Sequence, residues 1–253
     1  MSFKVTCVYD EGAKENTSLI GAKGSAMLVD VGERRLLFDT GLRGRYLAHN
    51  LSCLGIEPDS IDAVVVSQPY PDNYRGLDGL LKERTKPVDV YAMQGMYPEK
   101  SGLLSKSSGI SESNRANAIL HYDDGWIEPI PRVFRTPYFD SGNGYKEAYV
   151  VIDAPRGLAI LSGRGVGGPE NVLTEAESRF SKRTMAFLGS LDLEKSKKPV
   201  ADAYAASLAA HSVDDVYLNH RTGRNGITNV RVNLGLAGVK EFYAGFSYID
   251  ERS

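Results

Sequence analysis

The sequence predicts a layered α/β fold, and three observations support this prediction. Segments rich in β-branched residues alternate with amphipathic stretches along the chain. With 253 residues and 42% hydrophobic side chains, the chain can bury a sizeable core. Two sheet-and-helix halves of similar size follow one another, and no polar, Pro/Gly-rich linker separates them. We therefore expect residues 1–253 to form one domain.

The first half is expected to begin as a meander and to continue as an α/β unit. The expected strands are residues 3–9, 25–31, 34–39, 63–67 and 88–93, with Gly32 and Glu33 as a hairpin-like turn. Helices are expected at residues 45–54, ended by Gly55, and at residues 76–84. The Ser- and Gly-rich residues 97–124 predict a long surface insertion of the kind that often covers an active site.

The second half repeats this alternation. The expected strands are residues 148–153, 158–162, 185–191, 215–219 and 240–248. The expected helices are residues 171–180, 200–211 and 225–234. Pro199 precedes the second of these helices, where its missing N–H would be unpaired in any case.

Composition restricts the partners and the compartment. Thirty basic and 32 acidic residues leave a net charge of −2, so no overall field attracts nucleic acid or an anionic membrane surface. No apolar run is long enough to cross a membrane, which predicts a cytoplasmic protein. Two cysteines exclude a disulfide framework and a four-cysteine zinc site. The sequence does not indicate whether the protein is a monomer or an oligomer.

Two stretches resemble the metallo-β-lactamase superfamily. LVDVGERRLLFDTG, residues 28–41, ends in an Asp-Thr-Gly turn, and IDAVVVSQPYPDNYRGLDGLL, residues 61–81, contains the position of the family's His-x-His-x-Asp-His metal loop. At the four ligand positions of that loop stand Gln68, Tyr70, Asp72 and Asn73. The resemblance implies an αββα sandwich: two mixed β-sheets packed face to face, with helices on both outer faces.

Three later motifs extend the resemblance over about residues 20–250. In GLAILSGRGVGGPENVL, Arg164 and Val166 occupy the positions of a cysteine and a third histidine. In MAFLGSLDL, Asp192 occupies a histidine position, and in VYLNHRTGRNGITNVRVNLG, His220 is retained with Arg221 beside it. This set is similar to the branch that includes the dihydropterin-ribofuranosylaminobenzene phosphate synthases.

The substitutions remove most ligands of a dinuclear zinc site, which needs neutral imidazoles and carboxylates. Gln68, Tyr70 and Val166 replace all three ligands of the first metal that the resemblance implies. Asp72 and His220 remain for the second metal, so we expect no bound metal and no other cofactor. A magnesium ion on Asp72, with oxygens of Asn73 or Gln68, stays open as an alternative. Arg164 opposes it, and we expect Arg164 to replace the metal charge in a bidentate pair with Asp72.

The remaining candidates suit an anionic ligand. Arg221 and Arg224 flank a Thr-Gly turn before a helix, where a phosphate or carboxylate could bind, although both could simply be solvated. His220 and Asp72 would act as a general base if they hydrogen-bond. Alternatively, His220 is structural and Asp72 caps the following helix. Tyr70 is either a phenolic acid or fills the volume of the first metal.

We therefore expect a metal-independent protein that binds a small phosphorylated or pterin-like anion. Asp72, His220, Arg164 and Tyr70 are the expected catalytic residues, for transferase or lyase-type chemistry. The expected ligand-binding residues are Gln68, Asn73, Asp192, Arg221 and Arg224. Two alternatives stay open: a non-catalytic scaffold or regulatory pseudoenzyme, and a metal-dependent hydrolase whose site has moved to Asp192, Glu147 or His121.

Overall fold

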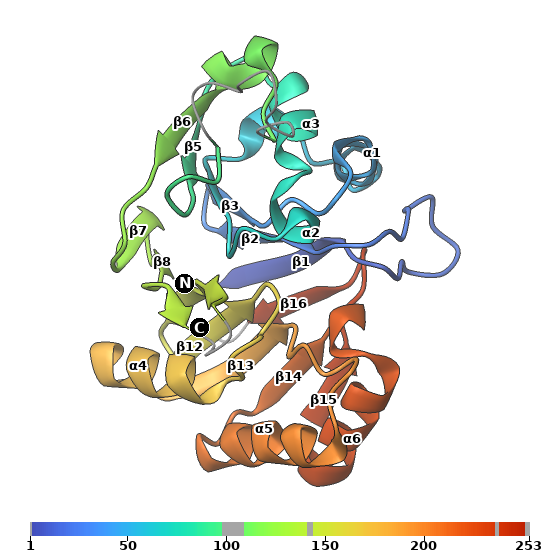
Figure 1. Ribbon diagram of the computed structural model, residues 1–253, viewed down its shortest axis with the longest axis vertical. Coiled ribbons are helices and arrows are strands. Elements are labelled where there is room, and N and C mark those ends of the chain that lie inside the picture. Colours follow the sequence, from blue (N-terminus) through green and yellow to red (C-terminus); the bar gives the residue numbers. More distant parts are fainter. Residues whose placement is uncertain (1, 98–108, 141–143, 236–237, 251–253) are drawn as a thin grey trace.

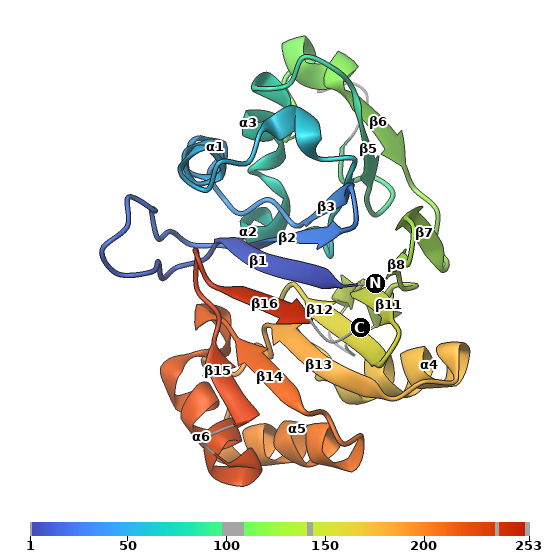
Figure 2. The ribbon, with the colours of Figure 1, turned by 180° about the vertical axis from the view of Figure 1, so that it is seen from behind.

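The structure is a computed structural model that describes residues 2–97, 109–140, 144–235 and 238–250. In these residues two seven-stranded mixed sheets pack face to face, and helices cover the outer face of each sheet (Figures 1 and 2). This arrangement confirms the predicted αββα sandwich. None of the helices in these ranges is long and apolar enough to cross a membrane.

The first sheet has the strand order β16-β1-β2-β3-β4-β5-β6. Its strands are β1 (Phe3–Tyr9), β2 (Ala26–Val31), β3 (Arg34–Phe38), β4 (Ala63–Val65), β5 (Val88–Tyr91), β6 (Ala118–His121) and β16 (Ser247–Asp250). From β16 to β3 neighbouring strands are antiparallel, and from β3 to β6 they are parallel. The helices of this half are α1 (Gly44–Cys53), α2 (Pro71–Tyr74) and α3 (Leu77–Lys82), with short 3-10 turns η1 (Pro58–Ser60) and η2 (Glu112–Asn117).

The second sheet has the order β15-β14-β13-β12-β11-β8-β7. Its strands are β7 (Ile127–Ile130), β8 (Val133–Arg135), β11 (Val150–Ala154), β12 (Gly157–Ser162), β13 (Thr184–Gly189), β14 (Asp215–Leu218) and β15 (Val239–Glu241). A separate two-stranded ribbon joins β9 (Phe139–Asp140) to β10 (Lys146–Glu147). The helices are α4 (Glu170–Phe180), α5 (Lys198–Ala210) and α6 (Arg224–Leu234), with the 3-10 turn η3 (His220–Thr222).

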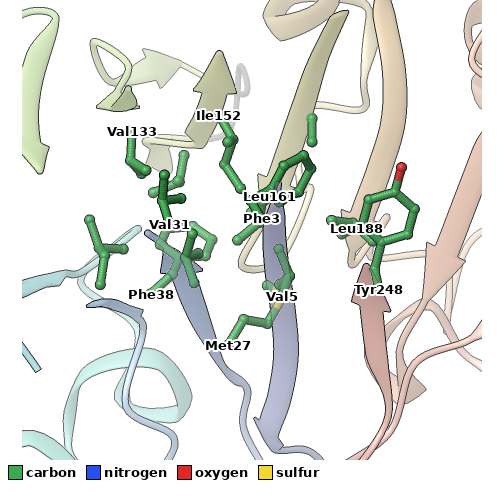
Figure 3. Close-up of a cluster of buried hydrophobic side chains, with 14 of the residues drawn as sticks. Phe3, Val5, Met27, Val31, Phe38, Val133, Ile152, Leu161, Leu188 and Tyr248 are labelled. Atoms are coloured by element: carbon green, nitrogen blue, oxygen red, sulfur yellow. The ribbon is translucent and has the colours of Figure 1, made fainter. Parts of the chain in front are cut away.

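The core lies in three apolar layers. The central layer joins the two sheets: Val5, Met27 and Phe38 face Ile152, Leu161 and Leu188 (Figure 3). A second layer lies between the first sheet and helices α1 and α3, and a third between the second sheet and α4, α5 and α6. Because both faces of each sheet are covered, strands such as β1 and β12 are almost continuously buried and read as apolar runs.

One expectation about the chain was wrong. The strand expected at residues 240–248 is two strands: β15 belongs to the second sheet, whereas β16 crosses to the first sheet and pairs with β1. Gly245, with φ of +94°, lies in the turn between them. Part of the segment expected as a surface insertion, residues 97–124, belongs to the first sheet, since β6 pairs with β5. Residues 98–108 of that segment lie outside the described residues.

Candidate functional site

The candidate site forms where four loops leave the carboxyl ends of β4, β12, β13 and β14. The last three strands are parallel neighbours, so the residues that follow them meet at one edge of the second sheet. These residues are Gly163–Val166, Ser190–Asp192 and Asn219–Thr222. The loop after β4, with α2, adds Tyr70, Asp72 and Asn73 from the first sheet.

Two arginines from different loops share one carboxylate oxygen. Asp192 Oδ1 accepts hydrogen bonds from Arg164 Nε at 3.3 Å and from Arg221 Nε at 3.2 Å. Arg221 Nη1 also donates to Asp72 Oδ2 at 3.3 Å. Lys23 Nζ lies 3.4 Å from the same Asp72 oxygen. The expected pair of Arg164 with Asp72 was therefore wrong, since Arg164 pairs with Asp192 and Arg221 pairs with Asp72.

Tyr70 supports these guanidinium groups from one side. The centre of the Arg164 guanidinium lies 4.0 Å from the centroid of the Tyr70 ring, and that of Arg221 lies 5.6 Å from it. Stacking on an aromatic face stabilises a cation and fixes the plane of the guanidinium. Tyr70 is half-buried and lines an open groove.

Two adjoining hollows share Arg164 and Arg221 in their walls. The inner cavity has a volume of about 10 Å³, and its walls include Asp10, Ser25, Asp72, Asn73, Arg164 and Arg221. The outer groove has a volume of about 480 Å³, and its walls include Lys23, Tyr70, Arg164, Asp192, Lys195 and Arg221. Arg164 Nη1 is buried and has no hydrogen-bond partner among the described residues. A donor of this kind normally finds an acceptor, since leaving it unpaired costs about 1–3 kcal/mol.

The loop that carries Arg164 is held by Glu147. The carboxylate of this buried residue accepts hydrogen bonds from the backbone N–H groups of Arg164 at 2.7 Å, Gly165 at 2.9 Å and Val166 at 3.1 Å. Burial raises the pKa of Glu147, and the three N–H groups counteract that rise. Three successive amides directed at one carboxylate form an anion-binding turn that the protein fills with its own side chain.

Asp39 anchors the loop after β4, which occupies the position of the family's metal loop, through hydrogen bonds from Ser67 and Asn73. Asn73 Nδ2 donates to Asp39 Oδ2 at 2.6 Å, and the backbone N–H and hydroxyl of Ser67 donate to the same carboxylate. Burial raises the pKa of Asp39 to about 7, against the lowering effect of these bonds. Gln68 is buried, with Nε2 at 3.4 Å from Asn73 Oδ1. Asn73 therefore lines the inner cavity while anchoring the loop, and Gln68 lines neither hollow.

His220 pairs with a residue that sequence reasoning missed. Its Nδ1 lies 2.6 Å from Asp10 Oδ2, at the end of β1, and its ring packs 3.9 Å from that of Tyr243. The expected base pair of His220 with Asp72 was therefore wrong. The hydrogen bond to Asp10 raises the pKa of His220. The signal for Asp10 was its position, a carboxylate directly after a buried strand.

Other candidates lie apart. Arg224 is exposed at the first residue of α6 and lines neither hollow. Asp72 lies in the first turn of α2, but its carboxylate contacts Arg221 and Lys23, which leaves the capping alternative without support. His121 pairs with Asp89 on β5 and lines neither hollow. Within the described ranges, no group of three or more His, Cys, Asp or Glu side chains is placed to hold a metal ion.

Comparison with solved structures decides the fold. A metal-dependent hydrolase of the β-lactamase superfamily, Tm1679, superimposes with a TM-score of 0.75 at 19% identity, over 97% of this chain and 98% of that one. The metallo-β-lactamase fold protein YhfI from Bacillus subtilis superimposes with a TM-score of 0.65 at 14% identity, over 99% and 100% of the two chains. The chain has the metallo-β-lactamase fold. No family model matches it.

Curated relatives match only part of this chain. The 7,8-dihydropterin-6-methyl-4-(β-D-ribofuranosyl)-aminobenzene-5'-phosphate synthase of Methanocaldococcus jannaschii is 27% identical over 100 residues, 38% of this chain and 34% of that protein. Exodeoxyribonuclease WalJ of Streptococcus pneumoniae is 27% identical over 97 residues, 38% and 35% of the two proteins. Each match spans about a third of the relative's length.

Proposed function

We propose that this metallo-β-lactamase-fold protein binds a small phosphate-bearing ligand in the outer groove through Arg164 and Arg221, without a dinuclear metal centre. The observation that carries the proposal is the buried Nη1 of Arg164, which has no hydrogen-bond partner in the part of the chain that the structure describes. Its Nε is already bonded to Asp192, so the guanidinium is held in one orientation with a donor to spare. An oxyanion that reaches this nitrogen supplies the missing acceptor, and a guanidinium matches phosphate geometry well.

The donor set does not fit the two divalent ions of the superfamily. Of the positions that match the metal motifs, Gln68, Tyr70 and Val166 offer no imidazole or carboxylate. His220 is engaged with Asp10, and the guanidinium of Arg221 bonds to Asp72. A dication beside two fixed guanidinium groups would be repelled by both. We therefore propose that the arginines provide the positive charge of the site.

The recognition is local and does not depend on net charge. Lys23 and Lys195 also line the outer groove, but so do Glu11 and Glu194, so the walls are mixed in sign. A groove of about 480 Å³ suits a ligand of metabolite size. The partial match to the aminobenzene-5'-phosphate synthase of Methanocaldococcus jannaschii supports a phosphorylated ligand. The net charge by itself is no ground for excluding nucleic acid as a ligand, and another relative is an exodeoxyribonuclease.

Transferase or lyase-type chemistry is the reaction class that we propose for such a site. Arg164 and Arg221 would stabilise negative charge that develops on the ligand, because their positions are already fixed by Asp192 and Tyr70. Preorganised charges of this kind need no rearrangement during the reaction.

Isothermal titration calorimetry with inorganic phosphate tests the proposal. Wild-type protein should bind, and Arg164→Gln should weaken binding at least about tenfold, which is the loss of one charge-assisted hydrogen bond. Arg224→Gln is the matched control, since Arg224 is exposed and lines neither hollow, and it should bind as the wild type does.

Three results would contradict the proposal. Phosphate could fail to bind the wild type, which favours the scaffold alternative. Arg164→Gln could bind as tightly as the wild type, which would place the anion elsewhere. Elemental analysis of protein purified without chelator could find one or more equivalents of zinc lost on mutation of Asp72 and His220, which favours a metal-dependent hydrolase.

A further inference from the structure

Asp10 is a buried carboxylate with one oxygen to spare. The residue is only 1% exposed, and its Oδ2 accepts hydrogen bonds from His220 Nδ1 at 2.6 Å and from the backbone N–H of Gly12 at 3.1 Å. Its other oxygen, Oδ1, is buried and has no partner among the described residues. Nothing in the anion-binding proposal uses this group.

Asp10 and Arg164 line the same inner cavity with opposite requirements. Asp10 Oδ1 needs a hydrogen-bond donor, whereas Arg164 Nη1 needs an acceptor. The cavity volume of about 10 Å³ is enough for a single group the size of a water molecule or a hydroxyl. A hydroxyl group meets both requirements at once, because it donates one hydrogen bond and accepts others.

We infer that the site selects an oxyanion that carries a hydroxyl group. The hydroxyl occupies the inner cavity, donating to Asp10 Oδ1 and accepting from Arg164 Nη1, while the charged oxygens face Arg221 and the outer groove. This inference rests on the proposed function and adds the ligand class. It makes hydrogenphosphate a ligand and sulfate a poor one, because sulfate has a similar shape but no proton to offer the carboxylate.

His220 is a positioning residue in this arrangement. Its Nδ1–H holds the Asp10 carboxylate by Oδ2, which leaves Oδ1 without a partner among the described residues. The ring fits only because residue 12 is glycine: a Cβ there would lie 2.0 Å from His220 Cε1.

Calorimetric titration with phosphate and with sulfate, near neutral pH, tests the inference. Wild-type protein should bind phosphate at least about tenfold more tightly than sulfate. The difference is the cost of placing a sulfate oxygen against the Asp10 carboxylate oxygen with no proton between them. In Asp10→Asn, the amide oxygen should keep the two donors at the Oδ2 position, so that Nδ2–H₂ faces the cavity. That variant should gain sulfate binding and lose the preference to within about threefold.

Asp202→Asn is the control, since Asp202 pairs with Lys198 on α5 and lines neither hollow; it should keep the wild-type preference. Equal binding of both anions by the wild type, or an unchanged preference in Asp10→Asn, overturns the inference and leaves the anion site standing. Failure of both anions to bind the wild type overturns the proposed function instead. The wild-type comparison needs no variant, so it decides even if Asp10→Asn does not fold.

Discussion

Replacing Glu147 by alanine should destabilise the protein strongly, because this side chain organises the loop that presents Arg164. Its carboxylate is the acceptor for three consecutive backbone N–H groups, those of Arg164, Gly165 and Val166. In Glu147→Ala all three donors lose their acceptor. Each buried, unpaired amide costs about 1–3 kcal/mol.

The magnitude follows from the exposure of the three amides. Arg164 and Val166 are half-buried, so water can reach their N–H groups after a small movement of the loop, whereas Gly165 is buried. We therefore expect Glu147→Ala to lower the free energy of unfolding by about 3–5 kcal/mol, a large share of the 5–15 kcal/mol typical of a folded domain. Glu147→Gln retains one acceptor oxygen and avoids burying a charge, so its loss should be about 1–2 kcal/mol.

Equilibrium unfolding in urea, followed by circular dichroism, measures these changes. Glu57→Ala is the control, since Glu57 is exposed before η1, and its effect should stay within about 0.5 kcal/mol. A loss below about 1 kcal/mol in Glu147→Ala, or a larger loss in Glu147→Gln than in Glu147→Ala, would refute the role of this carboxylate. Where Glu147→Ala is still folded, it should also bind phosphate more weakly, because Arg164 is no longer positioned.

Three further predictions concern charge and packing. Burial raises the pKa of Asp39 from 3.8 to about 7, so the protonated carboxyl stabilises the folded state. This stabilisation is fully present below pH 3.8 and is lost, by about 4 kcal/mol, as the pH rises through 7. In urea unfolding, Asp39→Asn should remove this dependence of stability on pH. The pKa of His220 should fall in Asp10→Asn, as ring-proton NMR titration will show; an unchanged value would contradict their pairing. Gly76→Ala should lower the melting temperature sharply, since its Cβ would lie 1.8 Å from the Thr40 carbonyl oxygen, whereas Gly125→Ala, with no atom within 4 Å, should not.

The elements that sequence reasoning predicted well have a sustained pattern of apolar residues. β1 was predicted with its observed bounds, and α4 to within one residue. Six of the seven residues of β1 are buried, and this continuous apolar run is visible in the chain itself. The short strands β7 to β10 were missed, because they have two to four residues and no sustained alternation.

The structure brings several of the expected site residues together, but the contacts expected between them were wrong. Tyr70, Asp72, Arg164, Asp192 and Arg221 do line the two hollows. Their contacts differ from expectation, since Arg221 and not Arg164 binds Asp72. Motif positions place residues on the right loops but do not say how far each side chain reaches.

The sequence by itself determined the layered fold and the loops that would meet at its edge, because apolar periodicity and motif order are properties of the chain. Only the tertiary structure decided that Asp10 pairs with His220, 210 positions later. It also decided that Asp10 and Arg164 line one cavity, each with a side-chain atom that has no partner among the described residues. Hydrogen bonds are directional and fail beyond about 3.5 Å, so partners are chosen by side-chain placement to within an ångström. That placement arises when the two sheets pack together, and no local pattern in the chain encodes it.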